Sequence, residues 1–182
     1  MRDVVLYELL SLDGVAEEPG DWMFEVDREV FENLGRIIHQ QTDVLLGRKT
    51  YDYWVDYWPT SDVEPFASFI NGTQKHVFSS SVPSSEWAKS TVVRSSAVPY
   101  VTGLKRQPGG DIGIHGSIDL ARSLLRAGLV DELRLVIAPT VAGHGRRLFD
   151  DGGVLKKLRL TDVDRTPSGT LLLDYRVDPD GS

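Results

Sequence analysis

The feature that most constrains the fold is a repeated alternation of strand and helix patterns along the first two-thirds of the chain. Continuous runs of β-branched and apolar residues at 4–10, 43–47 and 111–115 are typical of buried strands. Segments 27–41 and 118–129 instead carry apolar residues at spacings of one, three and four, which predicts amphipathic helices. Strands that alternate with helices form a largely parallel sheet with helices on both faces. The sequence therefore predicts an α/β fold of three layers, with the sheet between two layers of helices.

The C-terminal part of the chain carries a different pattern. The strand-like segments 155–166 and 169–177 flank "PSG" at 167–169, which predicts a hairpin. A hairpin adds antiparallel strands, so the sheet is expected to be mixed but mostly parallel. With 182 residues and no repeat or linker, the sequence predicts one domain over 1–178 and a frayed tail at 179–182.

Composition excludes several classes of function. The formal net charge of −7 disfavours nucleic acid as the main partner, because an acidic surface repels a polyanion. The chain has no cysteine, and its four histidines lack metal-ligand spacing, so no metal site is expected. The N-terminus does not have the pattern of a signal peptide, and no apolar run approaches the ~20 residues of a membrane span. A cytoplasmic protein with a small-molecule substrate and no membrane partner is expected.

Groups that can bind an anion follow three predicted strands, at 43–47, 75–78 and 111–115. Glycine lets a phosphate approach the backbone, a helix N-terminus favours negative charge, and arginine pairs with phosphate through two hydrogen bonds. The residues concerned are Gly47-Arg48-Lys49-Thr50, Ser79-Ser80-Ser81 and Gly116-Ser117. Since ligands bind at the carboxyl ends of strands in an open α/β sheet, several phosphate sites along one edge favour NADP over NAD. Each motif alone is more typical of a structural turn or loop than of a phosphate site.

A second group of residues lies around Asp27, at the start of the first predicted helix. Trp22 precedes Asp27 by five residues, and Phe31 follows it by four, on the same helix face. A carboxylate between two aromatic rings would suit a flat heterocycle, and burial there would raise the pKa of Asp27. The alternative is that Asp27 only caps the helix or complements its dipole.

Taken together, these segments resemble the dihydrofolate reductase superfamily, and most closely the reductase domain of bacterial riboflavin biosynthesis and its stand-alone relatives. The motifs that carry the resemblance are "LYELLSLDGVAEEPGDW", "DVLLGRKTYDYW", "KHVFSSS", "DIGIHGSIDLARSLLRAGLVDELRLVIAPTVAGHGRRLF" and the closing hairpin. They cover nearly the whole chain in the family's order. Two features depart from the pattern: Asp21 stands where a proline usually precedes the tryptophan, and the zinc deaminase domain is absent.

The resemblance implies a dihydrofolate reductase-like fold and an NADPH-dependent reductase that acts on a pterin-like or ribosylaminopyrimidine substrate. It implies Asp27 as the catalytic acid and Trp22 and Phe31 as substrate-binding residues. The implied cofactor-binding residues are Gly14, in the mobile loop 12–15, together with Gly47, Arg48, Lys49, Thr50, Ser79, Ser80, His115, Gly116, Ser117 and Ile118.

It also implies a homodimer, for which the apolar strand "TLLLDY" at 170–175 is a candidate interface, although a core strand has the same pattern. The alternative function is a non-catalytic, homodimeric NADP(H)-binding module.

Overall fold

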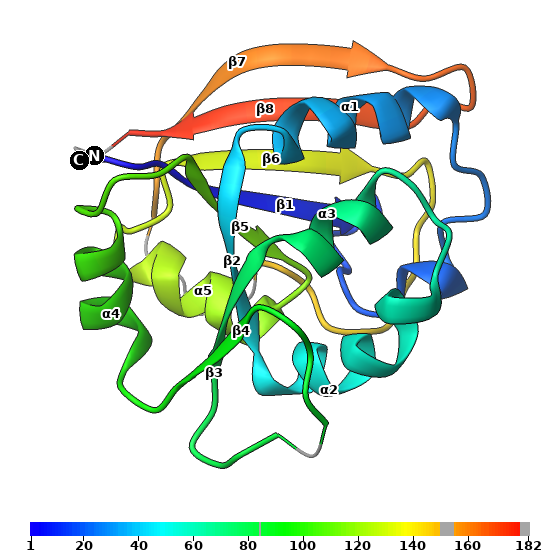
Figure 1. The fold of residues 1–182 in the computed structure, drawn as a ribbon. Coiled ribbons are helices and arrows are strands. Elements are labelled where there is room, and N and C mark those ends of the chain that lie inside the picture. Colours follow the sequence, from blue (N-terminus) through cyan, green and yellow to red (C-terminus); the bar gives the residue numbers. More distant parts are fainter. Residues whose placement is uncertain (84, 150–154, 179–182) are drawn as a thin grey trace.

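The computed structural model describes residues 1–83, 85–149 and 155–178 (Figure 1). The predicted tail at 179–182 lies outside the described residues. The strands are β1 (Val4–Leu10), β2 (Gln41–Gly47), β3 (Gln74–Phe78), β4 (Ser90–Val93), β5 (Asp111–His115), β6 (Glu132–Ile137), β7 (Leu158–Arg165) and β8 (Leu171–Val177). The helices are α1 (Arg28–Ile38), α2 (Arg48–Tyr57), α3 (Phe66–Gly72), α4 (Ala97–Leu104) and α5 (Ile118–Arg126), with short 3₁₀ turns at Pro19–Asp21 and Trp58–Thr60.

All these strands form one sheet in the order β4-β3-β2-β5-β1-β6-β8-β7. The first six pair in parallel, and the hairpin of β7 and β8 adds two antiparallel strands next to β6. The predicted α/β class, with a mostly parallel mixed sheet and a C-terminal antiparallel hairpin, is therefore confirmed.

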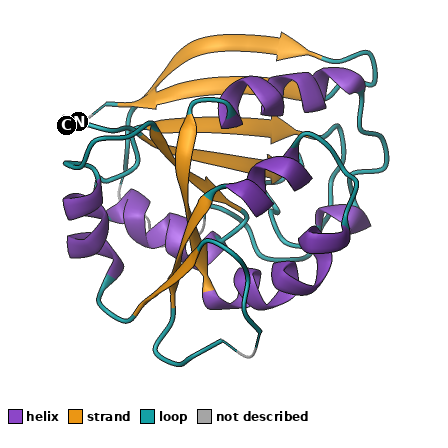
Figure 2. Ribbon diagram, viewed as in Figure 1, coloured by secondary structure: helices purple, strands orange, loops and turns teal. Residues whose placement is uncertain are grey.

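Helices cover both faces of the sheet and enclose two apolar layers (Figure 2). One layer packs α4 and α5 against the sheet through residues such as Val101, Leu124 and Ile114. The other packs α1, α2 and α3 through residues such as Leu34 and Ile70. Two layers arise because alternate residues of each strand point to opposite faces, and both faces of a mostly parallel sheet must be covered.

The strand that carries "TLLLDY" lies inside the sheet, where β8 pairs with β6 on one side and β7 on the other. Its two edges are occupied, so it cannot extend the sheet into a second copy. The core-strand alternative explains its apolar pattern, and β7 is the outer strand. Within the described parts of the chain, no helix is long and apolar enough to cross a membrane.

Candidate functional site

The connections between strands change direction at the carboxyl ends of β1 and β5, where a ligand-binding crevice is expected. From β1 the chain crosses through α1 to β2, whereas from the neighbouring β5 it crosses through α5 to β6, in the opposite direction across the sheet. The β1–β5 pairing stops at Tyr7 and His115, although β1 stays paired with β6 as far as Leu10. Such a switch point, at the carboxyl ends of the strands, is where open α/β sheets bind ligands.

Two of the predicted phosphate-binding turns meet at this crevice. The backbone N–H of Gly47 donates to the Ser117 hydroxyl oxygen at 3.0 Å, and that hydroxyl donates to Thr50 Oγ1 at 2.9 Å. Gly116 has a φ of +69°, in the left-handed region that favours glycine. The turns after β2 and β5 are thus joined by hydrogen bonds although they are 70 residues apart. Ile118, which begins α5, is buried in the layer beneath them.

The serines after β3 also lie near these turns, but Ser81 and not the predicted Ser80 contacts Arg48. Arg48 Nη1 donates to Ser79 Oγ at 3.3 Å and to Ser81 Oγ at 2.8 Å, and its Nε pairs with Asp52 at 2.5 Å. Ser80 is exposed, and its side chain makes no hydrogen bond within the described chain. The structure therefore places Ser81 next to the arginine.

Lys49 is exposed, beside Arg48 on the first turn of α2. It forms no ion pair with any described residue. Its predicted contact with the cofactor stays a prediction.

The imidazole of His115 lies away from these turns, in the aromatic cluster on the α3 side of the sheet. It is 3% exposed, its Nε2 lies 2.8 Å from Gln41 Oε1, and its ring centroid lies 5.2 Å from that of Phe66. Burial lowers the pKa of His115 to about 3, so the ring is neutral. Its side chain therefore belongs to the core, and only its backbone is available to a ligand in the crevice.

The loop that follows β1 is tied to the loop after β6. Asp13 accepts hydrogen bonds from the Ser11 hydroxyl at 2.6 Å and from the backbone N–H groups of Ala142 and Gly143 at 2.9 and 3.0 Å. These bonds hold the pKa of the Asp13 carboxyl well below its usual range. Gly14 has a φ of +84°, which permits the turn.

Two arginines of the second loop face carboxylates of the same protein. Arg146 pairs with Asp119 on α5, and Arg147 pairs with Asp13 at 3.4 Å. Their guanidinium groups connect the loop to its neighbours, so any anionic ligand would compete with these acids.

Asp27 has a partner that lies 141 residues away in the sequence. Its Oδ2 accepts hydrogen bonds from the Ser168 hydroxyl at 2.5 Å and the Ser168 backbone N–H at 3.1 Å. These bonds lower the pKa of Asp27, so the pKa rise predicted from burial is wrong. Asp27 occupies the N-cap position of α1, but its side chain makes no capping hydrogen bond. It therefore links α1 to the β7–β8 turn.

The two aromatic residues predicted around Asp27 have different environments. Trp22 is 4% exposed and its Nε1 donates to the Glu17 carbonyl at 2.9 Å. Phe31 is half-buried on α1. Trp22 is thus a packed and hydrogen-bonded side chain of the apolar layer, and the predicted substrate contacts of both residues stay predictions.

Removing the Ser168 hydroxyl is expected to raise the pKa of Asp27, because the variant loses the hydrogen bond that lowers this pKa most. Carboxyl NMR titration of wild type and Ser168→Ala measures this directly. Ser61→Ala, a serine on the turn after α2, is the control and should leave Asp27 unchanged. An identical Asp27 titration in Ser168→Ala and wild type would contradict this assignment.

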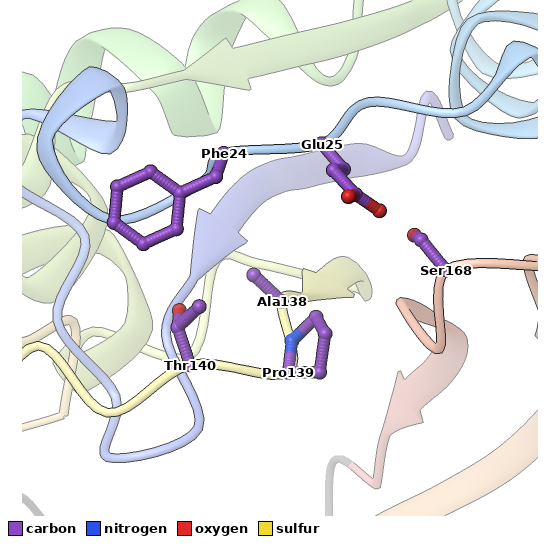
Figure 3. Close-up of a pocket in the computed structure, with 6 residues that line it drawn as sticks. All are labelled: Phe24, Glu25, Ala138, Pro139, Thr140 and Ser168. Atoms are coloured by element: carbon purple, nitrogen blue, oxygen red, sulfur yellow. The ribbon is translucent and has the colours of Figure 1, made fainter.

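A small cavity adjoins Asp27 through Ser168 (Figure 3). It has a volume of about 150 Å³ and is lined by Phe24, Glu25, Ala138, Pro139, Thr140 and Ser168. In Figure 3 the Glu25 carboxylate and the Ser168 hydroxyl point toward one another across it. The Leu12 N–H donates to the Thr140 carbonyl at 2.8 Å, so the cavity lies beside the end of β1. Sequence reasoning missed Phe24 and Glu25. Their sequence signal was only their position just before a predicted helix, which does not indicate a cavity.

Sequence reasoning also missed Glu8, a buried acid at the switch point. Alternation along β1 places it on the same face as Leu6 and Leu10, and it is 4% exposed. Its Oε2 has no hydrogen-bond partner in the described chain. Burial raises the pKa of Glu8 to about 8, against a smaller opposing effect of the Leu9 backbone. Glu8 is therefore mostly protonated at neutral pH.

Comparison with known proteins identifies the family and agrees with the fold. The RibD C-terminal domain model matches residues 2–172. Among curated relatives, the "Uncharacterized protein YyaP" of Bacillus subtilis (strain 168) is 28% identical over 96% of this chain and 94% of its own. The "Uncharacterized protein YwjB" of the same strain is 30% identical over 87% of this chain and 89% of its own.

Solved structures share the fold at low sequence identity. A putative riboflavin biosynthesis protein from Shewanella sp. PV-4 aligns with a TM-score of 0.79 at 17% identity, over 97% of this chain and 99% of that one. A diaminohydroxyphosphoribosylaminopyrimidine deaminase/5-amino-6-(5-phosphoribosylamino)uracil reductase from Thermotoga maritima aligns with a TM-score of 0.70 at 16% identity, over 97% of this chain and 57% of that one. This chain spans little more than half of the second protein. The fold is dihydrofolate reductase-like, and the chain belongs to the RibD C-terminal domain family.

Proposed function

We propose that the chain is an NADPH-dependent reductase that transfers hydride to a pterin-like or ribosylaminopyrimidine substrate. The observation that carries the proposal is that two glycine turns, at the ends of β2 and β5, are joined by hydrogen bonds beside the β1/β5 switch point, with an arginine and two serines next to them. Family membership supports a reductase-like fold of the riboflavin pathway type. The cofactor and substrate are inferred from the chemistry of the site.

The residues present fit a cofactor with a pyrophosphate and an additional phosphate. The turns at Gly47–Thr50 and Gly116–Ser117 would hold the pyrophosphate through backbone N–H groups and hydroxyls. Arg48 would bind the 2′-phosphate, because its Nη2 makes no hydrogen bond with any described residue. When bound, NADPH supplies the hydride.

The cavity around Ser168 would take the ring of the substrate. Its volume of about 150 Å³ is below the ~300–1,000 Å³ of complete small-molecule sites, so it would hold one heterocycle and leave the rest of the substrate outside. Phe24 offers an apolar ring face, and Glu25 offers a carboxylate that can accept hydrogen bonds from ring N–H and amino groups. Asp27, with its lowered pKa, would act as an anion that orients the substrate or a water, and not as a proton donor.

Loss of NADPH absorbance tests the proposal. Incubation of the protein with NADPH and 5-amino-6-(5-phosphoribosylamino)uracil, or with dihydrofolate, should oxidise NADPH in proportion to enzyme. Asp27→Asn should slow this oxidation by about 10–10³-fold if the carboxylate orients the substrate. If NADPH binds but is not oxidised with any tested substrate, the non-catalytic binding module is favoured instead. If NADPH does not bind, both functions are contradicted.

A further inference from the structure

A tryptophan of α2 lies against the second glycine turn of the candidate cofactor site. A Cβ placed on Gly116 would lie 3.5 Å from Trp54 Cζ2, so the indole ring packs against that turn. Trp54 follows Thr50 by four residues and therefore lies on the same face of the helix. Thr50 contacts the same turn, because its Oγ1 accepts the hydrogen bond from Ser117. One face of α2 thus brings a hydroxyl and an indole to the Gly116–Ser117 turn.

Two neighbouring rings hold the indole of Trp54 in place. Its ring centroid lies 5.9 Å from that of Trp58 and 5.5 Å from that of Phe66, at interplanar angles of 85° and 79°. Edge-to-face contacts of this kind are favourable, and they fix the orientation of the ring. Trp54 is nevertheless only half-buried, and no ring of the described residues lies parallel to it. A flat ligand can therefore stack on the indole without displacing another ring.

The order of the strands places Trp54 and the cavity around Ser168 on opposite sides of the β1/β5 switch point. Trp54 lies beside Gly116, which directly follows β5. The cavity instead lies beyond β1, where Ala138 follows β6 and Ser168 stands between β7 and β8. A ring bound where β1 and β5 part would have the indole on one side and the substrate cavity on the other. Hydride transfer needs this order, because the nicotinamide must lie next to the substrate.

The aromatic cluster around Trp54 contains a histidine that carries no charge. The ring centroid of His115 lies 5.2 Å from that of Phe66, and its low pKa keeps the imidazole neutral at physiological pH. His115 therefore does not repel a positively charged ring bound beside Trp54. The face of an indole attracts a cation electrostatically, and the attraction is strongest where water is excluded.

We propose that Trp54 contacts the nicotinamide ring of the cofactor and favours its oxidised, cationic form. This inference rests on the proposed function, because it assigns a residue to the cofactor of that reaction. The nicotinamide ring is positively charged in NADP⁺ and neutral in NADPH, whereas both nucleotides carry the same phosphates. A preference that arises from Trp54 therefore acts on the ring alone. The oxidised cofactor would be held more tightly, so a high ratio of NADP⁺ to NADPH would slow the reductase.

Calorimetric titration of wild type and Trp54→Leu with NADP⁺ and with NADPH tests this role. The variant should weaken NADP⁺ about three- to thirtyfold more than it weakens NADPH, the range expected for the loss of a cation–π contact at a partly buried site. Each protein is compared with itself, so a partly unfolded variant would lose both nucleotides to the same extent and leave the affinity ratio unchanged.

Two further variants make the titration specific. Trp54→Phe keeps a smaller aromatic face, so its ratio of NADP⁺ to NADPH affinity should lie between those of wild type and Trp54→Leu. It also tests the role of the ring if Trp54→Leu does not fold. Tyr175→Leu is the control, because it removes a half-buried aromatic ring of β8 that pairs with Leu133, near the amino end of β6. Its affinity ratio should equal that of wild type.

Two results would overturn the inference and leave the proposed function intact. The first is an affinity ratio that Trp54→Leu and Trp54→Phe leave unchanged, and the second is a change in Tyr175→Leu as large as that in Trp54→Leu. In both cases wild type still binds NADPH. If wild type binds neither nucleotide at millimolar concentration, the proposed function itself is contradicted, and the role of Trp54 is contradicted with it.

Discussion

Replacement of Glu8 by glutamine is expected to make the protein more stable than wild type above neutral pH, by about 4 kcal/mol at pH 9. In the folded protein Glu8 keeps its proton up to a pKa of about 8, whereas the unfolded chain releases it near 4.5. The unfolded state therefore binds fewer protons between these values, so the free energy of unfolding of wild type falls as pH rises through that window. Glutamine has the same shape and no proton to lose.

Protonation of His115 changes the stability in the opposite direction, and does so at lower pH. Its folded pKa of about 3 lies below the ordinary 6.5, so the unfolded chain binds the extra proton and stability falls as pH drops from 6.5 toward 3. Between about pH 4.5 and 6.5 the two contributions oppose one another. Wild type should therefore be most stable in this range. The free energy of unfolding of the Glu8→Gln variant should keep rising with pH and level off only above pH 6.5.

Urea unfolding of wild type and Glu8→Gln at pH 5, 7 and 9 measures the difference. The two proteins should have similar free energies of unfolding at pH 5 and diverge as pH rises. Glu25→Gln is the matched control, because it makes the same substitution at an exposed glutamate. A wild-type stability that rises between pH 7 and 9 would contradict a buried, protonated Glu8.

Replacement of Arg48 by alanine is expected to weaken NADPH binding about 10–100-fold and leave NADH binding nearly unchanged. The guanidinium would contribute charge-assisted hydrogen bonds to the 2′-phosphate, worth ~1.5–3 kcal/mol together, and NADH lacks that group. Ser79 and Ser81 already hold the guanidinium in place, so the effect should be local.

Two further variants separate geometry from charge in this experiment. Arg48→Lys keeps the charge but loses the planar fork, so its NADPH affinity should fall between wild type and alanine. Arg28→Ala removes an arginine whose side chain is 82% exposed on α1, and it should have no effect. Calorimetric titrations with both nucleotides would contradict the assignment if Arg48→Ala weakened NADPH and NADH equally.

The fold was predictable from the sequence because its signals are local. Continuous apolar runs identify the buried strands, period-3.6 patterns identify α1 and α5, and right-handed crossovers limit how those strands can be ordered. The turns at Gly47 and Gly116 were predictable for the same reason, since each directly follows an apolar strand.

The environment of the acids was not predictable, because it depends on distant contacts. The hydrogen bond from Ser168 lowers the pKa of Asp27, and Ser168 comes near Asp27 only when the β7–β8 hairpin has formed. Glu8 interrupts an apolar run and gave no sign that it would be the buried acid at the switch point. Ser80 was predicted beside Arg48, but Ser81 lies there, because the path of the chain after β3 places its side chain one residue later.

A crystal structure of the protein with NADPH would show where the cofactor binds. We expect the pyrophosphate between the Gly47–Thr50 and Gly116–Ser117 turns, with the 2′-phosphate on Arg48 and the nicotinamide in the β1/β5 crevice. A cofactor bound elsewhere on the protein, or no bound cofactor in crystals grown at millimolar NADPH, would contradict it.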